Sequence, residues 1–165
     1  MEETTIRAAR ASDEAALGRY GGALMRLHHQ FDPQRFLTIE HPEKGYGRFL
    51  VSHLADLDNV VLVAELGGEV VGYVWATLEP LSWKDLRDAC GFIQDVFVDE
   101  RARGAGIGAR LTRGAMDELE ARGAPRVVLM SAAKNAPAQR LFERLGFRHT
   151  MAEMTHELNP AQKEL

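Results

Sequence analysis

Three glycines lie close together in this chain of 165 residues, where an apolar segment gives way to a helical pattern. The apolar segment is residues 92–98, and the glycines follow as Gly104, Gly106 and Gly108. A glycine-rich turn that opens a helix leaves backbone N–H groups unpaired and directs them, with the positive end of the helix dipole, at one point. Glycine lets the backbone approach a ligand because no Cβ stands between them. The pattern predicts a site for a phosphate or pyrophosphate group.

The charges around these glycines also favour an anionic ligand. Four arginines and no acidic residue lie between residues 101 and 116, whereas the whole chain has a formal net charge of −4. The basic patch is therefore local, which favours a small anion over a nucleic acid. Its members are Arg101, Arg103, Arg110 and Arg113.

Two segments resemble the GNAT superfamily of N-acetyltransferases. The family's acetyl-CoA signature is Q/R-x-x-G-x-G/A, and residues 103–108 read R-G-A-G-I-G. Residues 135–147 read N-A-P-A-Q-R-L-F-E-R-L-G-F, which is similar to the family's N-x-x-A-x-x-L-Y-E-x-x-G-F segment. The resemblance extends from residue 59 to residue 158, while residues 10–58 resemble the family only in being helical.

The resemblance implies one acetyltransferase domain over residues 1–165 that transfers an acetyl group directly from acetyl-CoA. The acceptor would be a small amine or an exposed amino group, and the family is compatible with a homodimer. In the family, backbone N–H groups of the strand before the turn bind the pantetheine and the thioester oxygen. By resemblance, the cofactor contacts come from Phe97, Val98, Arg103, Gly104, Ala105, Gly106, Ile107, Gly108, Asn135 and Phe142.

The same glycines allow two other interpretations. Residues 104–109 also fit the dinucleotide fingerprint G-x-G-x-x-G/A. That fingerprint requires the glycines directly after the strand and an acidic residue at the end of the next strand. Here four residues, 99–102, intervene, and residues 126–131 are followed by Ala-Ala-Lys, so a nicotinamide-dependent oxidoreductase is disfavoured. The other interpretation is a purely structural helix N-terminus.

Asp95 is the candidate catalytic base because an acidic residue within the apolar segment 92–98 is unusual, and burying an unpaired carboxylate is costly. The structural alternative is an aspartate that pairs with an arginine or caps backbone donors. Glu79 and Glu153 are weaker candidates for the base. His28 and His29 are candidates to line an amine pocket.

Phe142 stands where many family members have a tyrosine that protonates the departing thiolate. Phenylalanine has no proton to donate, so another group or water must serve, or the thiolate leaves unprotonated. The substitution also allows a different function, in which the chain is a regulatory module that binds CoA without catalysis.

Acidic residues gather along the chain near the strands expected to flank the acceptor. A negative pocket raises the local concentration of cations, so we expect a cationic amine as acceptor. The residues are Glu79, Asp85, Asp88 and Asp95.

The element pattern predicts an α/β fold. We expect a mixed, mostly antiparallel sheet of six to seven strands with helices on both faces, and the resemblance adds that splayed central strands hold CoA. The strands are predicted at residues 4–8, 60–66, 70–78, 92–98, 127–130 and 147–158. The helices are predicted from a cap at Ser12, with a bend at Gly21 and Gly22, and then at 46–57, from the glycine turn to Gly123, and at 136–145.

Composition narrows the class of protein. The chain contains no apolar run of the ~18 residues that a membrane span needs. Its single cysteine, Cys90, allows no internal disulfide and no zinc-type cluster, and the acidic start does not resemble a signal peptide. We therefore expect a cytoplasmic protein without a metal site and without a membrane or nucleic-acid partner. Cys90 is predicted to be packed, and Trp75, Trp83 and Tyr46 to lie in the core or a pocket wall.

Overall fold

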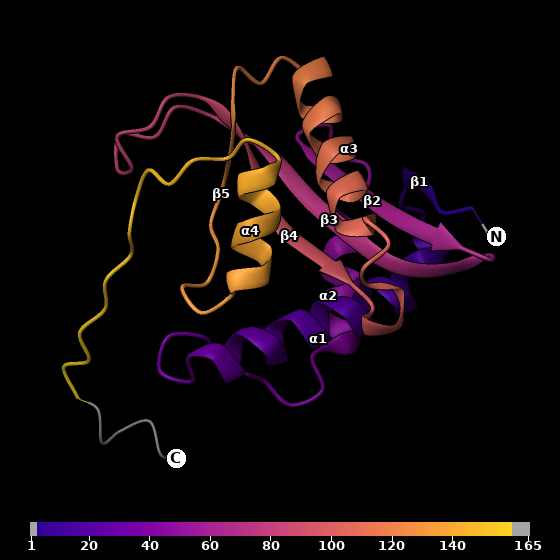
Figure 1. Ribbon diagram of the computed structural model, residues 1–165, viewed down its shortest axis with the longest axis horizontal. Coiled ribbons are helices and arrows are strands. Elements are labelled where there is room, and N and C mark those ends of the chain that lie inside the picture. The colour runs from indigo at the N-terminus through magenta and orange to yellow at the C-terminus, as the bar shows by residue number, and fades with distance from the viewer. Residues whose placement is uncertain (1–2, 160–165) are drawn as a thin grey trace.

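A computed structural model describes residues 3–159, so Met1 and Glu2 of the acidic start lie outside it. Within that range it contains one five-stranded sheet in the order β1-β2-β3-β4-β5 (Figure 1). The first four strands pair antiparallel, and β5 pairs parallel to β4. The strands are β1 (Thr5–Ala8), β2 (Asn59–Leu66), β3 (Glu69–Glu79), β4 (Cys90–Val98) and β5 (Val127–Leu129).

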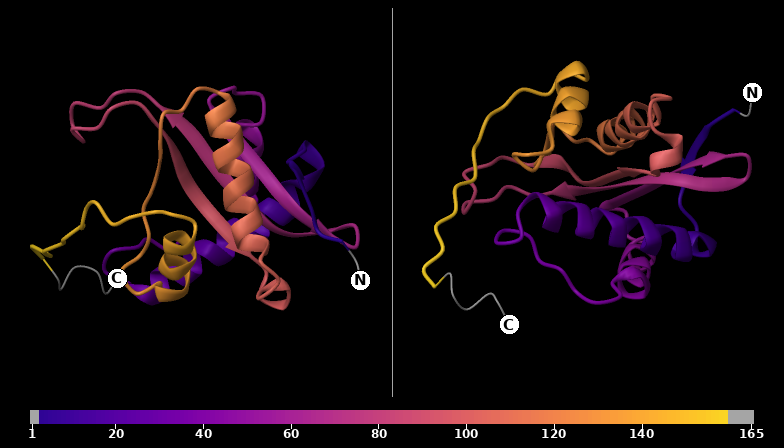
Figure 2. Two further views of the ribbon diagram at one scale, coloured as in Figure 1. Left: turned by 45° about the horizontal axis from the view of Figure 1, so that its top comes forward. Right: turned by 60° about the horizontal axis from the view of Figure 1, so that its bottom comes forward.

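Helices cover both faces of the sheet, as predicted (Figure 2). One face carries α1 (Glu14–Phe31) and α2 (Glu43–Ser52), and the other carries α3 (Ile107–Ala121) and α4 (Ala136–Arg144). Alternate residues of a strand point to opposite faces, and this separates two apolar clusters. Val61, Val63 and Tyr73 face α1 and α2, whereas residues such as Leu62 and Val74 face α3.

Glycines bring α1 and α2 into direct contact. A Cβ on Gly18 would lie 2.1 Å from the Glu43 carbonyl oxygen, and one on Gly47 would lie 2.5 Å from the Glu14 carbonyl oxygen. A Cβ on Gly21 would lie 2.1 Å from the ring of Tyr46. The helix α1 continues without a break through Gly21 and Gly22, where a bend is predicted, and Gly21 leaves room for the packing of α2.

The strands β4 and β5 pair over only three residues and then separate. Their register ends at Ile93 opposite Leu129, so the side of β4 that faces β5 has no strand partner from Gln94 to Val98. The register between β3 and β4 also shifts here, since Trp75 pairs with Asp95 but Ala76 pairs with Ile93. Gln94 is therefore the extra residue of a β-bulge, which bends the strand at the point of separation.

Two expectations about the elements are wrong, and with the first of them the described sheet has five strands instead of the expected six to seven. Residues 147–158 form no strand within the described range. Met151 and Met154 on this segment are 87% and 91% exposed, so its alternation has no buried face against the chain's own sheet. Asp13, which accepts hydrogen bonds from Arg7 and from the Arg10 N–H, precedes α1 in place of the predicted Ser12 cap.

The connection between β3 and β4 contains a tryptophan that is not buried as predicted. Trp83 lies in this connection and is 84% exposed, so it belongs neither to the core nor to a pocket wall. Cys90, at the start of β4, is buried as predicted. Among residues 3–159, no helix has both the length and the apolar content to cross a membrane.

Candidate functional site

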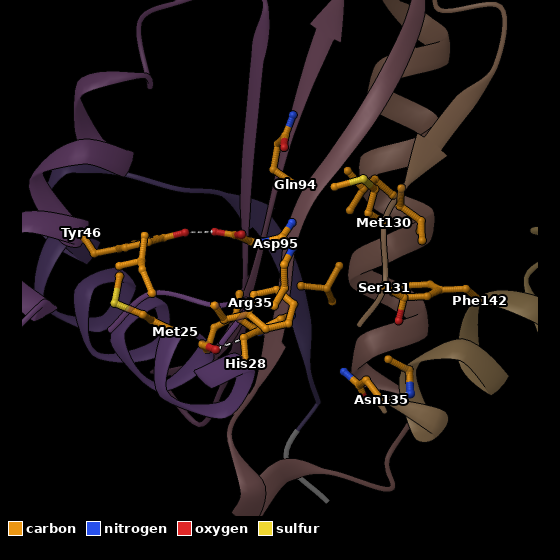
Figure 3. A pocket seen from close by; sticks show the side chains of 17 residues that line it. Met25, His28, Arg35, Tyr46, Gln94, Asp95, Met130, Ser131, Asn135 and Phe142 are labelled. Carbon is orange, nitrogen blue, oxygen red and sulfur yellow. Dashed lines mark hydrogen bonds between the residues drawn. The ribbon is translucent and has the colours of Figure 1, made fainter. Parts of the chain in front are cut away.

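A cavity of about 370 Å³ opens where β4 and β5 separate (Figure 3). Its walls come from both faces of the sheet: from α1, α2 and the segment between them, and from β4, β5, the segment after β5, and α4. The gap between the strands therefore joins the two faces at one point. The lining consists of Leu24, Met25, His28, Arg35, Phe36, Leu37, Tyr46, Ile93, Gln94, Asp95, Val96, Leu129, Met130, Ser131, Asn135, Ala138 and Phe142.

Asp95 lines this cavity, and two tyrosines hold its carboxylate. The hydroxyl of Tyr46 donates to Asp95 Oδ2 over 2.5 Å, and the hydroxyl of Tyr73 donates to the same oxygen over 2.9 Å. Tyr73 lies diagonally across from Asp95, because the residue directly opposite Asp95 on β3 is Trp75, two positions further along the strand. No residue of the described chain donates a hydrogen bond to Oδ1.

Burial tunes the protonation of this cluster. Loss of solvation raises the pKa of Asp95, against the hydrogen bonds from Tyr46 and Tyr73 and the nearby His28, which lower it. Burial and the charge of Asp95 raise the pKa of Tyr46 well above its ordinary value, so Tyr46 keeps its proton and remains a donor. A carboxyl group with a raised pKa is suited to accept a proton from a reacting group.

On the α1 side of the cavity, the basic side chains have partners within the protein. Arg35 pairs with Glu153 from the C-terminal segment, so its charge is compensated. The Nδ1 atom of His28 lies 2.9 Å from the Leu24 carbonyl oxygen, and the His28 ring packs edge-on against Phe36. Asp95 is thus the one lining carboxylate in the described chain, and no cationic side chain pairs with it.

The glycine turn lies on the opposite face, before α3. Gly104 and Gly106 have φ angles of +84° and +74°, which favour glycine, and a Cβ on either would meet nothing within 4 Å. Gly106 is the N-cap of α3, and no side chain caps the helix. The first N–H groups of this 15-residue helix therefore point into open space with the positive end of its dipole.

The rest of the turn is shaped by packing. Ile107 is buried, and a Cβ on Gly108 would lie 3.2 Å from Leu141 of α4. Ala105 is exposed between these two glycines. Phe97 stacks on Tyr20 with ring centroids 5.6 Å apart, so its side chain packs against α1, and its backbone pairs with Tyr73 of β3.

The four arginines differ in what they contact. Arg101 pairs with Asp99 and Glu69, so its charge is compensated within the protein. Arg103 donates from Nε to the Val98 carbonyl oxygen over 3.0 Å and thereby fixes the end of β4. Arg110 and Arg113 are exposed on α3.

Asn135 and Phe142 line the cavity from the α4 side. The Oδ1 atom of Asn135 accepts a hydrogen bond from the Ala138 N–H and caps the helix. Phe142 is buried and packs edge-on against Phe147. No hydroxyl is therefore present at the position where the family resemblance implies one.

Several predicted site residues lie elsewhere. Glu79 accepts hydrogen bonds from Thr77 and Gln94, and Asp85 pairs with Lys84 in the connection after β3. With Asp88, they do not line the cavity, so the expected acidic cluster is reduced to Asp95. Glu153 and His29 are also absent from the lining.

Sequence reasoning missed the roles of Tyr46 and Tyr73. The sequence predicts for Tyr46 only a place in the core or a pocket wall, and the partners that it suggests for Asp95 are an arginine or backbone donors. The available signal was the glycine-rich stretch of α1, since Gly21 leaves the space that the Tyr46 ring occupies.

The chain is similar to proteins named acetyltransferases. It is 33% identical over 100 residues to a mycothiol acetyltransferase of Thermomonospora curvata, with 61% of this chain and 31% of that protein covered. It thus spans about a third of that relative's length. It is 29% identical to the uncharacterized N-acetyltransferase YhfO of Bacillus subtilis, with 96% of this chain and 99% of that protein covered.

A solved structure and a family model were also matched to the chain. A predicted acetyltransferase from Clostridium acetobutylicum, solved with acetyl-CoA, superposes with a TM-score of 0.67 at 18% identity and covers 94% of this chain and 97% of that one. This likeness shows a shared fold. The model of the acetyltransferase (GNAT) family matches residues 24–147, which is most of the chain. The chain belongs to the acetyltransferase (GNAT) family.

Proposed function

We propose that this protein transfers an acetyl group directly from acetyl-CoA to the nitrogen of a primary amine. The observation that carries the proposal is the cavity between β4 and β5, which joins the α3 side of the sheet to the α1 side and contains Asp95. Two molecules that enter from opposite faces would meet there. Such a transfer requires a helix N-terminus that binds the phosphates of the cosubstrate, backbone groups that hold its thioester, and a base for the amine.

The cosubstrate would bind along the α3 side. The open N–H groups at Gly106 and the start of α3 fit a pyrophosphate, and the side of β4 that lacks a strand partner near Phe97 and Val98 can pair with the amides of pantetheine. Related proteins support this assignment, since one structure with the same fold was solved with acetyl-CoA. No metal enters the scheme.

The amine would bind on the α1 side, beside Asp95. An ammonium group is attracted by a carboxylate that has no cationic partner in the described chain. The ammonium first loses one proton to solvent, so that the neutral nitrogen can bond to the thioester carbon. The nitrogen then becomes acidic, and Asp95 Oδ1, the oxygen that the tyrosines do not occupy, accepts its second proton. The C–S bond then breaks, and the electron pair leaves with sulfur.

The alternative is a module that binds CoA without catalysis, and Phe142 is the observation that favours it. Asp95 argues against it, because a desolvated carboxylate that opens on the cavity is costly to keep without a purpose. Release of free thiol from acetyl-CoA in the presence of amines supports the enzyme, and tight CoA binding without release supports the module.

Thermal unfolding with candidate ligands tests cosubstrate binding. Acetyl-CoA at 100 times its Kd should add ~2.7 kcal/mol to the free energy of unfolding, which raises Tm by several degrees. NAD and NADP should give no shift, because the mostly antiparallel sheet is not the parallel doubly wound sheet that binds dinucleotides. Absence of a shift with millimolar acetyl-CoA contradicts the proposal.

A further inference from the structure

Ser131 has a buried hydroxyl without a hydrogen-bond partner. Within residues 3–159, three buried side-chain polar atoms lack a partner: His53 Nε2, Arg87 Nε and Ser131 Oγ. The His53 ring stacks on Trp75, and the Arg87 guanidinium contacts Cys90 through its Nη1 atom. Of the three residues, Ser131 alone lines the cavity between β4 and β5.

Ser131 lies on the wall of the cavity, close to the point where β4 and β5 separate. The residue follows β5 directly after the strands have separated, two residues beyond the last register pair at Leu129. It shares the α4 wall of the cavity with Asn135 and Phe142, opposite Tyr46 and Asp95 (Figure 3). Phe142 is the residue at which the family resemblance leads one to expect a hydroxyl.

An unsatisfied buried hydroxyl destabilises the protein by itself and calls for a partner. A serine can donate one hydrogen bond and rotate to suit an acceptor. The described chain offers it no acceptor, which leaves the partner to a water or to a bound ligand.

We propose that the Ser131 hydroxyl donates a hydrogen bond to the sulfur of the cosubstrate and so takes the place of the hydroxyl that Phe142 lacks. This inference rests on the proposed function. As the tetrahedral intermediate collapses, the C–S bond breaks and its electron pair moves to sulfur, where the hydrogen bond stabilises the negative charge. Ser131 keeps its proton, because a thiol with a pKa near ~8.5 is a much stronger acid than an aliphatic hydroxyl. The thiolate afterwards takes its proton from water.

Titration of the thiol of bound CoA tests this assignment without any acceptor. The ultraviolet absorbance of the thiolate is followed against pH in complexes of CoA with the wild type and with Ser131→Ala. A hydrogen bond to the charged sulfur lowers the pKa of the bound thiol, so its loss should raise that pKa by about 1 to 2 pH units. In the double variant Ser131→Ala and Phe142→Tyr, the pKa of the bound thiol should fall again. The reason is that the new tyrosine supplies a hydroxyl from the same wall of the cavity.

Turnover and stability provide independent readouts. Ser131→Ala should lower kcat by about 10- to 100-fold with little change in the Kd of acetyl-CoA, and the double variant should recover activity. The Tm of Ser131→Ala without ligand should not fall, since no internal hydrogen bond is lost. Ser52→Ala is the matched control, because Ser52 donates to the Phe49 carbonyl oxygen on α2 and does not line the cavity.

The outcomes separate this inference from the proposed function. Unchanged titration of the bound thiol in Ser131→Ala overturns the inference, as does an effect confined to the Kd of acetyl-CoA. A fall in Tm without ligand that accounts for the lost activity also overturns it, because Ser131 would then be structural. Failure of the wild type to bind CoA at all overturns the proposed function instead.

Discussion

Tyr46 and Asp95 lie on different layers of the fold and are joined by a hydrogen bond of 2.5 Å from the tyrosine hydroxyl to the carboxylate. Tyr46 belongs to α2 and Asp95 to β4, 49 residues later in the chain. The second carboxylate oxygen accepts no hydrogen bond from the described chain. It therefore connects the packing of the helical layer to the protonation of the candidate base.

Tyr46→Phe should raise the pKa of Asp95 further. The hydroxyl favours the charged carboxylate, so its removal makes the carboxylate harder to form. A base must be deprotonated to act, and the acidic limb of the pH–rate profile should move to higher pH. Tyr20→Phe is the control, because Tyr20 donates to Asp99 and the Val70 carbonyl oxygen away from Asp95. A profile that moves equally in both variants would count against the link.

Asp95→Asn should lower turnover by roughly 10²–10⁴-fold and leave acetyl-CoA binding unchanged. It should also change the pH dependence of stability. The pKa of Asp95 is raised in the folded state, so its contribution is favourable while the group is protonated and is lost as the pH rises through the folded-state pKa. The stability of the variant relative to wild type should therefore increase with pH in thermal unfolding. Wild-type turnover in Asp95→Asn would show that the carboxylate is structural.

Gly21→Ala should disturb the site from a distance. The added Cβ would lie 2.1 to 2.7 Å from three ring atoms of Tyr46, so the ring must leave the position from which its hydroxyl donates to Asp95. Overpacking of this kind destabilises by about 1–3 kcal/mol, and the shift of the pH–rate profile should resemble that of Tyr46→Phe. Gly45→Ala is the control on α2, since its Cβ would meet nothing within 4 Å. Its expected effect is a small gain in stability, as alanine is the better helix former.

Gly106→Val should abolish binding of acetyl-CoA. A valine there would place its side chain in the open space before α3 and would also be strained by the φ of +74°. Gly123→Val separates the two effects, because Gly123 has a φ of +92° and equally open surroundings beyond the other end of α3. Calorimetric titration should show binding to Gly123→Val and none to Gly106→Val. Equal affinities would mean that the pyrophosphate binds elsewhere.

Much of the fold was predictable because its signals are local. The alternation of β2 and β3 and the apolar spacing of α3 are visible in sequence, and each depends on which side of one element is buried. The prediction of a strand at 147–158 is wrong because it used only the local alternation of residues. Alternation leads to a strand only where a neighbouring strand and a buried face exist. Met151 and Met154 have neither within the described chain.

The site was predictable only in part because its geometry is not local. Asp95 was identified by its contrast with the apolar residues around it, and the structure places it on the cavity. Its partners come from other elements: Tyr46 lies on the helix α2, and Tyr73 lies on the neighbouring strand β3. No spacing in the sequence relates either tyrosine to Asp95. Glu79 and Asp85 are close to Asp95 in sequence, but the connection after β3 carries Asp85 away and Glu79 is held by Thr77 and Gln94.

The most direct test of the account is acetyl transfer to a panel of cationic, neutral and acidic acceptors. Thiol release from acetyl-CoA is measured for each, and the product is identified by mass spectrometry, with wild type and Asp95→Asn in parallel. We expect N-acetylated products from cationic primary amines, formed by the wild type and strongly reduced in the variant. Binding of acetyl-CoA without transfer to any amine, or transfer only to neutral or acidic acceptors, would contradict the account.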